Sequence, residues 1–181
     1  KIENSILNSI ESPLSQFQKD LMSYYNKRIS KSEFLSKYGH LRPGTYDITQ
    51  LRYDQDNKFL EQMQFKSNTS TAKIPLNKIN KILEKNGIDT SSINFIDFVK
   101  QSLEYREEFK FQFTKNLSDI LELINDIGNE FGFSRNEIAN LDIKTIIKSK
   151  NLNKNIIKQE WDKKIQLNEK QKKIKNYLIL P

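Results

Sequence analysis

The chain has 181 residues, a length that suits one domain with a substantial core and is short for a multidomain enzyme. With 36% hydrophobic and 10% aromatic residues, it is too apolar for a disordered segment. No run approaches the roughly 18 consecutive apolar residues of a membrane span, and the absence of cysteine excludes disulfides and thiolate metal ligands. We therefore expect a soluble, cytoplasmic protein that contacts no membrane.

The net charge of +7 invites a nucleic-acid interpretation, because clustered lysines neutralise phosphates and release counterions. The lysines are instead spread among glutamates and asparagines, and only KQKKIK at 170–175 forms a concentrated run. A solvated helix face is the preferred explanation for this run. Binding of nucleic acid or another acidic partner by the basic C-terminal helix remains as a non-enzymatic alternative.

The first predicted helix covers about 13–28. Ser12 is a suitable N-cap, and Pro13 fits the first helical position, where a backbone N–H is not needed. Spacings of three and four then connect the residues Leu14, Phe17, Leu21, Tyr24 and Arg28. This pattern is typical of an amphipathic helix.

The next segments predict shorter helices and loops. Ser32 should cap a short helix, EFLSKY, which Gly39 would end in the left-handed conformation typical of a C-terminal cap. The small, polar residues of 66–73 predict a mobile loop, and 75–86 predicts a helix closed by Gly87. No segment has the alternation of a convincing strand.

The longest periodic segment predicts one helix over about 92–131. Steps of three and four pass through Ile96, Val99, Leu103, Arg106, Lys110, Phe113, Leu117, Ile120, Ile124, Ile127 and Phe131. Arg106 and Lys110 therefore lie about one turn apart within an otherwise apolar seam. Because burying two unpaired cations is severely unfavourable, this face should meet carboxylates or a water-filled cleft that holds an anion.

An alternative places the two cations at the flank of the core stripe. Phe109, Phe111 and Phe113 would then carry the stripe locally. Arg106 and Lys110 would pair with neighbouring glutamates, namely Glu104, Glu107 or Glu108.

The stretch FLSKYGHLRPGTYDI predicts a structured turn at 39–48. Pro43 fixes its own backbone and biases Arg42 toward an extended conformation. Gly44 permits a turn that is closed to residues with a side chain. Such a turn directs its polar side chains.

Three side chains of this turn are candidates for binding a ligand. Arg42 can clamp a phosphate or carboxylate, His40 can donate a hydrogen bond or a proton, and Asp47 can orient either. In the alternative, His40 and Asp47 only tie the loop to a neighbouring helix and the turn is architectural.

Aromatic residues supply weaker candidates for a pocket. Tyr46, Tyr105 and Phe109 are of the type that lines organic-ligand sites, whereas Trp161 in IIKQEWDKKI is expected in the core. No cluster of histidine, cysteine or carboxylate has metal-ligand spacing, so we expect no metal site in this chain.

Two blocks of the sequence carry a resemblance to known enzymes. FLSKYGHLRPGTYDI has the pattern F-L-x-x-Y-G-H-x-x-P-G-x-x-D. The block at 105–147 has R-E-x-x-K-F-x-F-T-x-x-L-S-x-x-L, followed by G-x-S-R-x-x-(L/I)-x-x-L-x-I. Both resemble the central region of phosphoenolpyruvate synthase-like enzymes, a group that includes pyruvate phosphate dikinase and rifampin phosphotransferase. The final YLILP looks like the segment leading into their phosphohistidine domain.

The resemblance implies a phosphoryl relay. In that family an ATP-grasp region phosphorylates a histidine on a small mobile domain, which delivers the phosphoryl group to an acceptor elsewhere. This chain has neither a glycine-rich ATP-binding loop nor the segment around the carrier histidine. Residues 1–181 are therefore expected to be a single, acceptor-side helical domain of a longer phosphotransferase, inactive alone.

The resemblance also implies partners and a site. ATP and Mg²⁺ would serve the full-length protein without binding this chain, and its partners would be the ATP-grasp and phosphohistidine domains and a small-molecule acceptor. Relatives place basic residues near the acceptor at the positions of Arg106 and Lys110, which should project toward the same cavity as the 40–47 turn. His40 follows a helix end and is not expected to be the phosphoryl carrier.

The expected fold is all-α. One long helix at about 92–131 should form the centre, with the helices near 13–28 and 153–176 packed beside it. The differences between HLRPGTYD and the family pattern leave the acceptor open, either pyruvate or a larger hydroxyl-bearing compound.

Overall fold

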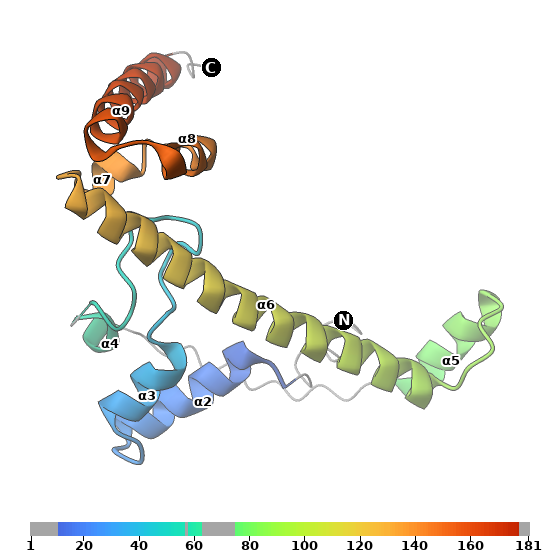
Figure 1. The fold of residues 1–181 in the computed structure, drawn as a ribbon. Helices are drawn as coiled ribbons and strands as arrows, with labels where there is room; N and C mark the ends of the chain where they lie inside the picture. Colours follow the sequence, from blue (N-terminus) through green and yellow to red (C-terminus); the bar gives the residue numbers. More distant parts are fainter. Residues whose placement is uncertain (1–10, 57, 63–74, 178–181) are drawn as a thin grey trace. The chain divides into compact units, whose positions relative to one another are not determined.

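A computed structural model describes residues 11–56, 58–62 and 75–177 (Figure 1). Every regular element in these ranges is a helix and none is a strand, which confirms the all-α prediction. None of the described helices is long and apolar enough to cross a membrane. The loop predicted at 66–73 lies outside the described residues.

The helices follow one another along the chain as α2 (Pro13–Tyr25), α3 (Lys31–Tyr38), α4 (Phe59–Gln62), α5 (Leu76–Lys85), α6 (Ser92–Glu130), α7 (Arg135–Ile138), α8 (Ile143–Lys148), the 3₁₀ turn η1 (Ser149–Asn151) and α9 (Lys154–Tyr177). The four helices predicted at 13–28, 75–86, 92–131 and 153–176 are present; two of them start where predicted, and the other ends differ by one to three residues. α4, α7 and α8 are too short for a periodic pattern to predict.

The chain forms two compact units. The first unit contains the described residues of Lys1–Gly39 and Asp56–Lys115, and the second contains those of His40–Gln55 and Asn116–Pro181. The long helix α6 contributes its first part, up to Lys115, to the first unit and the remainder to the second.

Serines cap at least four of the described helices, one of them Ser91, which accepts the N–H of Asn94 at the start of α6. The other three form capping boxes. The side chains of Ser12, Ser30 and Ser134 each accept a hydrogen bond from the backbone three residues on, and each is part of a reciprocal capping box. The predicted cap at Ser32 is therefore wrong by two residues: Glu33, at the third position after Ser30, completes the box.

Glycine conformations differ partly from the prediction. Gly39 keeps right-handed helical angles (φ −58°, ψ −31°), so the predicted left-handed cap is wrong there. Its N–H still bonds the carbonyl of Leu35, because the chain continues the helical turn before leaving α3. Gly87 and Gly132, after α5 and α6, do have positive φ, 66° and 83°.

The first unit has an aromatic core between α2 and α3. The rings of Phe17 and Tyr38 lie 5.0 Å apart at 85°, and Phe34 packs against both. Tyr38 also faces Phe111 of α6 at 6.1 Å, which places α3 beside the first part of α6.

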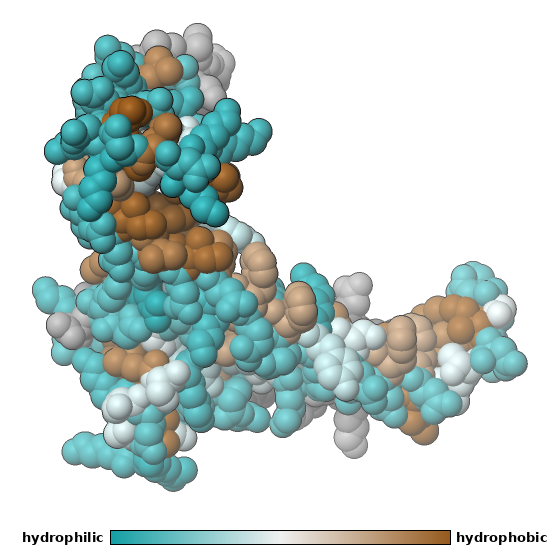
Figure 2. All heavy atoms as spheres, in the orientation of Figure 1, coloured by the Kyte–Doolittle hydropathy of each residue, from teal (hydrophilic) through white to brown (hydrophobic). Residues whose placement is uncertain are grey.

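A second, smaller cluster joins α5 to the start of α6. Ile79 and Leu83 of α5 pack against Ile96 of α6. Hydrophobic surface nevertheless remains at α5 (Figure 2), where Leu76 and Ile82 are exposed, as is Ile88 just after the helix.

The core of the second unit is built around Trp161 of α9. Its side chain is 2% exposed, and it packs with Ile48, Phe133, Ile138 and Ile165. The indole N–H donates to the hydroxyl of Ser149 at 2.8 Å, which satisfies its one polar group. The predicted core position of Trp161 is confirmed, and α9 packs beside the end of α6 through Phe131 at 5.4 Å.

Candidate functional site

The structured turn predicted at 39–48 is present, and all of it after Gly39 belongs to the second unit. Asp47 N–H donates to the Gly44 carbonyl at 2.9 Å, and the Asp47 carboxylate accepts from the hydroxyl and the N–H of Thr49 at 2.6 and 2.9 Å. These bonds from Thr49 lower the pKa of the Asp47 carboxyl. The carboxylate thus stabilises its own loop.

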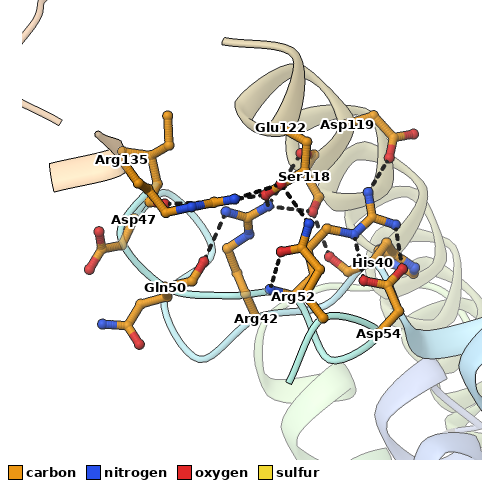
Figure 3. Close-up of polar contacts among 12 residues, drawn as sticks. His40, Arg42, Asp47, Gln50, Arg52, Asp54, Ser118, Asp119, Glu122 and Arg135 are labelled. Atoms are coloured by element: carbon orange, nitrogen blue, oxygen red, sulfur yellow. Dashed lines mark hydrogen bonds and ion pairs between the residues drawn. The ribbon is translucent and has the colours of Figure 1, made fainter. Parts of the chain in front are cut away.

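Arg42 is the buried anchor of the turn (Figure 3). Its side chain is 1% exposed. Nη1 donates to the Gln50 carbonyl at 3.2 Å, and Nη2 donates at 2.9 Å to both Ser118 Oγ and Glu122 Oε1. Arg42 therefore ties the turn to the part of α6 that belongs to the second unit.

Ser118 connects the same turn a second time. Its hydroxyl donates to the His40 carbonyl at 2.6 Å while accepting from Arg42. His40 itself is buried, with 5% of its surface exposed. Ser118 thus holds the backbone of His40 and the side chain of Arg42 to the same turn of α6.

Glu122 is the acceptor at the centre of this network. Arg135 donates to it through both Nη atoms, at 2.9 and 2.8 Å, and Gln55 donates at 2.7 Å. These contacts, led by the Arg135 hydrogen bonds and opposed by burial, lower the pKa of Glu122 to about 2. Its carboxylate is therefore charged at any physiological pH, as two neighbouring guanidinium groups require.

Arg135 and Arg52 complete the network. Arg135 Nη1 also donates to the Ile48 carbonyl at 3.0 Å, so the far end of the turn is held as well. Arg52 lies on the outside, where it bonds Asp54 and Asp119. Arg42 and Arg135 therefore hold the turn, and Arg52 holds the segment that follows it to Asp119 of α6.

The geometry determines what Arg42 is able to bind. Its two Nη groups are occupied by Gln50, Ser118 and Glu122, and among the described residues only its buried Nε lacks a hydrogen-bond acceptor. A phosphate or carboxylate ligand would have to displace Glu122 from the guanidinium. The ligand-binding roles of His40, Arg42 and Asp47 stay predictions, and the observed contacts are those of an architectural turn.

Arg106 and Lys110 lie in the first unit, whereas the turn lies in the second. Both are exposed, and Arg106 pairs with the carboxylate of Glu107. The prediction that they lie inside the apolar seam is wrong, because the packed face steps by four from Leu103 through Glu107 to Phe111. The alternative is observed in part: both cations lie outside the packed face and Phe111 packs against Tyr38, but Phe109 and Phe113 are exposed. A cavity shared with the turn stays a prediction.

The three aromatic pocket candidates are all exposed. Tyr46, Tyr105 and Phe109 have 75%, 74% and 77% of their surface accessible. Tyr105 lines a cleft in the first unit. No cluster of three or more metal-ligating side chains occurs in the described part of the chain, and the expected absence of a metal site stays a prediction.

Sequence reasoning missed Ser118, Glu122 and Arg135. The sequence did contain a sign of a polar cluster. Ser118 and Glu122 are polar residues one turn apart, and they continue the packed face of the long helix after Phe111. Polar residues on a packed face need buried partners, and Arg42 and Arg135 supply them.

In the basic run near the C-terminus, Lys170 is exposed and Lys172 donates to the side-chain oxygen of Asn140 at 2.6 Å. Comparison with known proteins adds nothing to this picture, since no family model, curated protein or solved structure matches the chain.

Proposed function

We propose that this chain is the acceptor-side helical domain of an ATP-dependent phosphotransferase of the phosphoenolpyruvate synthase-like family. It would contribute acceptor binding, while ATP-grasp and phosphohistidine domains elsewhere in the same polypeptide would bind ATP and Mg²⁺ and carry the phosphoryl group.

One observation carries the proposal. The resemblance depends on two blocks, 34–48 and 105–147, that are far apart in the sequence. In the second unit these blocks meet: Arg42 of the first block bonds Ser118 and Glu122 of the second, and Arg135 of the second bonds the Ile48 carbonyl of the first. Ser118 also donates to the carbonyl of His40, and both of these residues occupy fixed positions of the quoted patterns, as Arg135 does. Arg42, Ile48 and Glu122 stand outside the fixed positions, so the two blocks hold each other in place partly through residues that the patterns leave open.

The network also suits the chemistry proposed. Phosphoryl transfer depends mainly on positioning the reacting groups, so a domain that receives the phosphoryl group benefits from a rigid loop beside the acceptor. A turn tied to α6 through Arg42, Ser118 and Arg135 has that rigidity.

The test uses the complete natural polypeptide that contains this chain. Incubation with radiolabelled ATP should give a phosphohistidine, recognised because it is labile to acid and stable to alkali. Subsequent incubation with pyruvate, and with a panel of larger hydroxyl-bearing compounds, should transfer the label to one acceptor. A polypeptide without flanking ATP-grasp and phosphohistidine domains, or without acid-labile phosphate, would overturn the proposal.

Two variants separate the acceptor side from the ATP side. Arg106→Ala and Lys110→Ala should leave histidine phosphorylation intact and block onward transfer, because both cations are proposed to hold the anionic group during transfer. Lys115→Ala is the matched control, an exposed cation of the same helix that should transfer at the parent rate. Parent-rate transfer in Arg106→Ala and Lys110→Ala would remove both residues from the site.

A further inference from the structure

A cleft of about 430 Å³ opens in the first unit between the start of α2, the end of α3 and the first part of α6. Its volume is within the range of small-molecule sites, which is about 300–1,000 Å³. The residues that matter for recognition are of two kinds, aromatic and acidic: Tyr38, Tyr105, Phe111, Glu11, Glu104 and Glu108.

The aromatic residues form an apolar wall. Tyr38 is buried and its ring meets that of Phe111 edge to face, at 6.1 Å and 68°. Tyr105 stands at the opening with 74% of its surface exposed. Aromatic faces attract cations through their negative quadrupole, most strongly where water is partly excluded.

The acidic residues leave the cleft with uncompensated negative charge. Among the described residues, Glu104 accepts the backbone N–H of Glu11, at 3.0 Å, and Glu108 accepts the side-chain amide of Gln112, at 2.8 Å. No described basic side chain forms an ion pair with either carboxylate. Glu11 has one distant partner, Lys19 at 3.6 Å, and both of these side chains are largely exposed.

The one basic residue that lines the cleft is already neutralised. Lys37 donates to the carboxylate of Asp20 at 3.0 Å, and Asp20, which is buried, also accepts from the hydroxyl of Tyr38 at 3.0 Å and the amide of Gln16 at 2.8 Å. Lys37 is therefore committed to Asp20, and no basic side chain in the described part of the chain is paired with the carboxylates that α6 contributes to the cleft.

We propose that this cleft binds an organic cation, an ammonium group carried on an aromatic or other apolar body. The ammonium would lie between the carboxylates of Glu104 and Glu108, and the apolar body would lie against Tyr105 and Phe111. Anions of the same size, pyruvate and phosphate among them, are repelled by the same carboxylates. The proposal rests on this cleft alone and is independent of the phosphotransferase proposed above.

Three indole compounds that differ in charge test the recognition directly. Tryptamine is a cation, tryptophol is its neutral analogue and indole-3-acetate is an anion, so the shared ring isolates the effect of charge. In isothermal titration calorimetry with the 181-residue chain at pH 7 and low salt, tryptamine should bind saturably. Tryptophol should bind at least about tenfold more weakly, and indole-3-acetate should not bind.

Variants locate the binding in the cleft. Glu104→Gln combined with Glu108→Gln should weaken tryptamine about tenfold or more and leave tryptophol unchanged, so an intact tryptophol affinity shows that the cleft still folds. Tyr105→Ala should weaken tryptamine severalfold and Tyr105→Phe should restore it. Glu160→Gln, which removes an exposed carboxylate of α9, is the matched control and should bind as the parent does.

Two results would overturn the proposal. Equal affinities for tryptamine and tryptophol, or no tryptamine binding at millimolar concentration, would show that the cleft does not select a cation. Unchanged tryptamine affinity in the double glutamine variant would place any binding elsewhere.

Discussion

Glu122 accepts hydrogen bonds from Arg42, Arg135 and Gln55 while its own side chain is 13% exposed. Arg42 is buried more completely, and among the described residues Glu122 is the carboxylate with which it forms an ion pair. A buried ion pair adds little over a well-packed apolar pair, but removing one member leaves the other charged and unpaired. The turn at 39–48 therefore depends on this one carboxylate.

Glu122→Gln should destabilise the second unit by about 3 kcal/mol, because Arg42 and Arg135 lose their shared counter-charge. Urea unfolding followed by the fluorescence of Trp161, which lies in the core of this unit, measures the loss. Asp119→Asn is the control: its carboxylate is 56% exposed and should matter by less than about 1 kcal/mol. Equal effects of the two substitutions would contradict the role given to Glu122.

The acid dependence of stability should report the same residue. The pKa of Glu122 falls from its ordinary 4.5 to about 2 on folding. The stabilisation is therefore fully present above pH 4.5 and is lost as the pH drops from about 4.5 to about 2, a change of roughly 3 kcal/mol. Unfolding of the parent and of Glu122→Gln between pH 2 and 7 should show a flatter profile for the variant; parallel profiles would exclude Glu122 as the source.

Packing between helices depends on a glycine of α6. A Cβ atom on Gly128 would overlap with Cγ1 and Cδ1 of Ile138, which is 2% exposed and cannot move aside. Gly128 thus lets α7 approach the end of α6 and allows Ile138 to reach the core around Trp161.

Gly128→Ala should destabilise the second unit by about 1–3 kcal/mol, although alanine is the better helix former by about 1 kcal/mol in an open helix. Ile138→Ala removes the two overlapping atoms. In a chain that already carries Ile138→Ala, the substitution Gly128→Ala should therefore no longer destabilise the unit. A double-mutant cycle on thermal unfolding measures this coupling. Additive effects would show that Gly128 is not in contact with Ile138.

At the scale of the whole molecule, the division into two units has a measurable consequence. The only tryptophan, Trp161, is in the second unit, whereas far-ultraviolet circular dichroism detects helices of both. A local defect in the first unit should therefore change the two signals differently.

Asp20→Asn provides that defect, because Asp20 is buried in the first unit and accepts from Lys37, Tyr38 and Gln16. Burial alone would raise its pKa, but the three hydrogen bonds outweigh burial and lower it, so the charged form is the one stabilised. The variant should lower the midpoint seen by circular dichroism more than that seen by Trp161 fluorescence. Equal shifts would mean that the two units unfold together.

Much of the fold was predictable and most of the site was not. The long helices have strong periodicity and their caps are local, so 13–28, 75–86, 92–131 and 153–176 could be placed within a few residues. The face of α6 that packs was ambiguous, because steps of three through Arg106 and of four through Phe111 both satisfy helical geometry. Only the aromatic partner Tyr38 decides between them.

By itself the sequence determined the helical class, the long helix and the presence of a specialised turn, since each follows from neighbours within a few positions. The tertiary structure alone decided that Arg42 meets Ser118 and Glu122, that Arg135 completes the cluster, and that Arg106 and Lys110 lie exposed. Neighbouring residues in the sequence do not indicate a pairing between residues about 80 positions apart. Such a pairing depends on which helix faces the turn and on which charged groups are desolvated in the folded core.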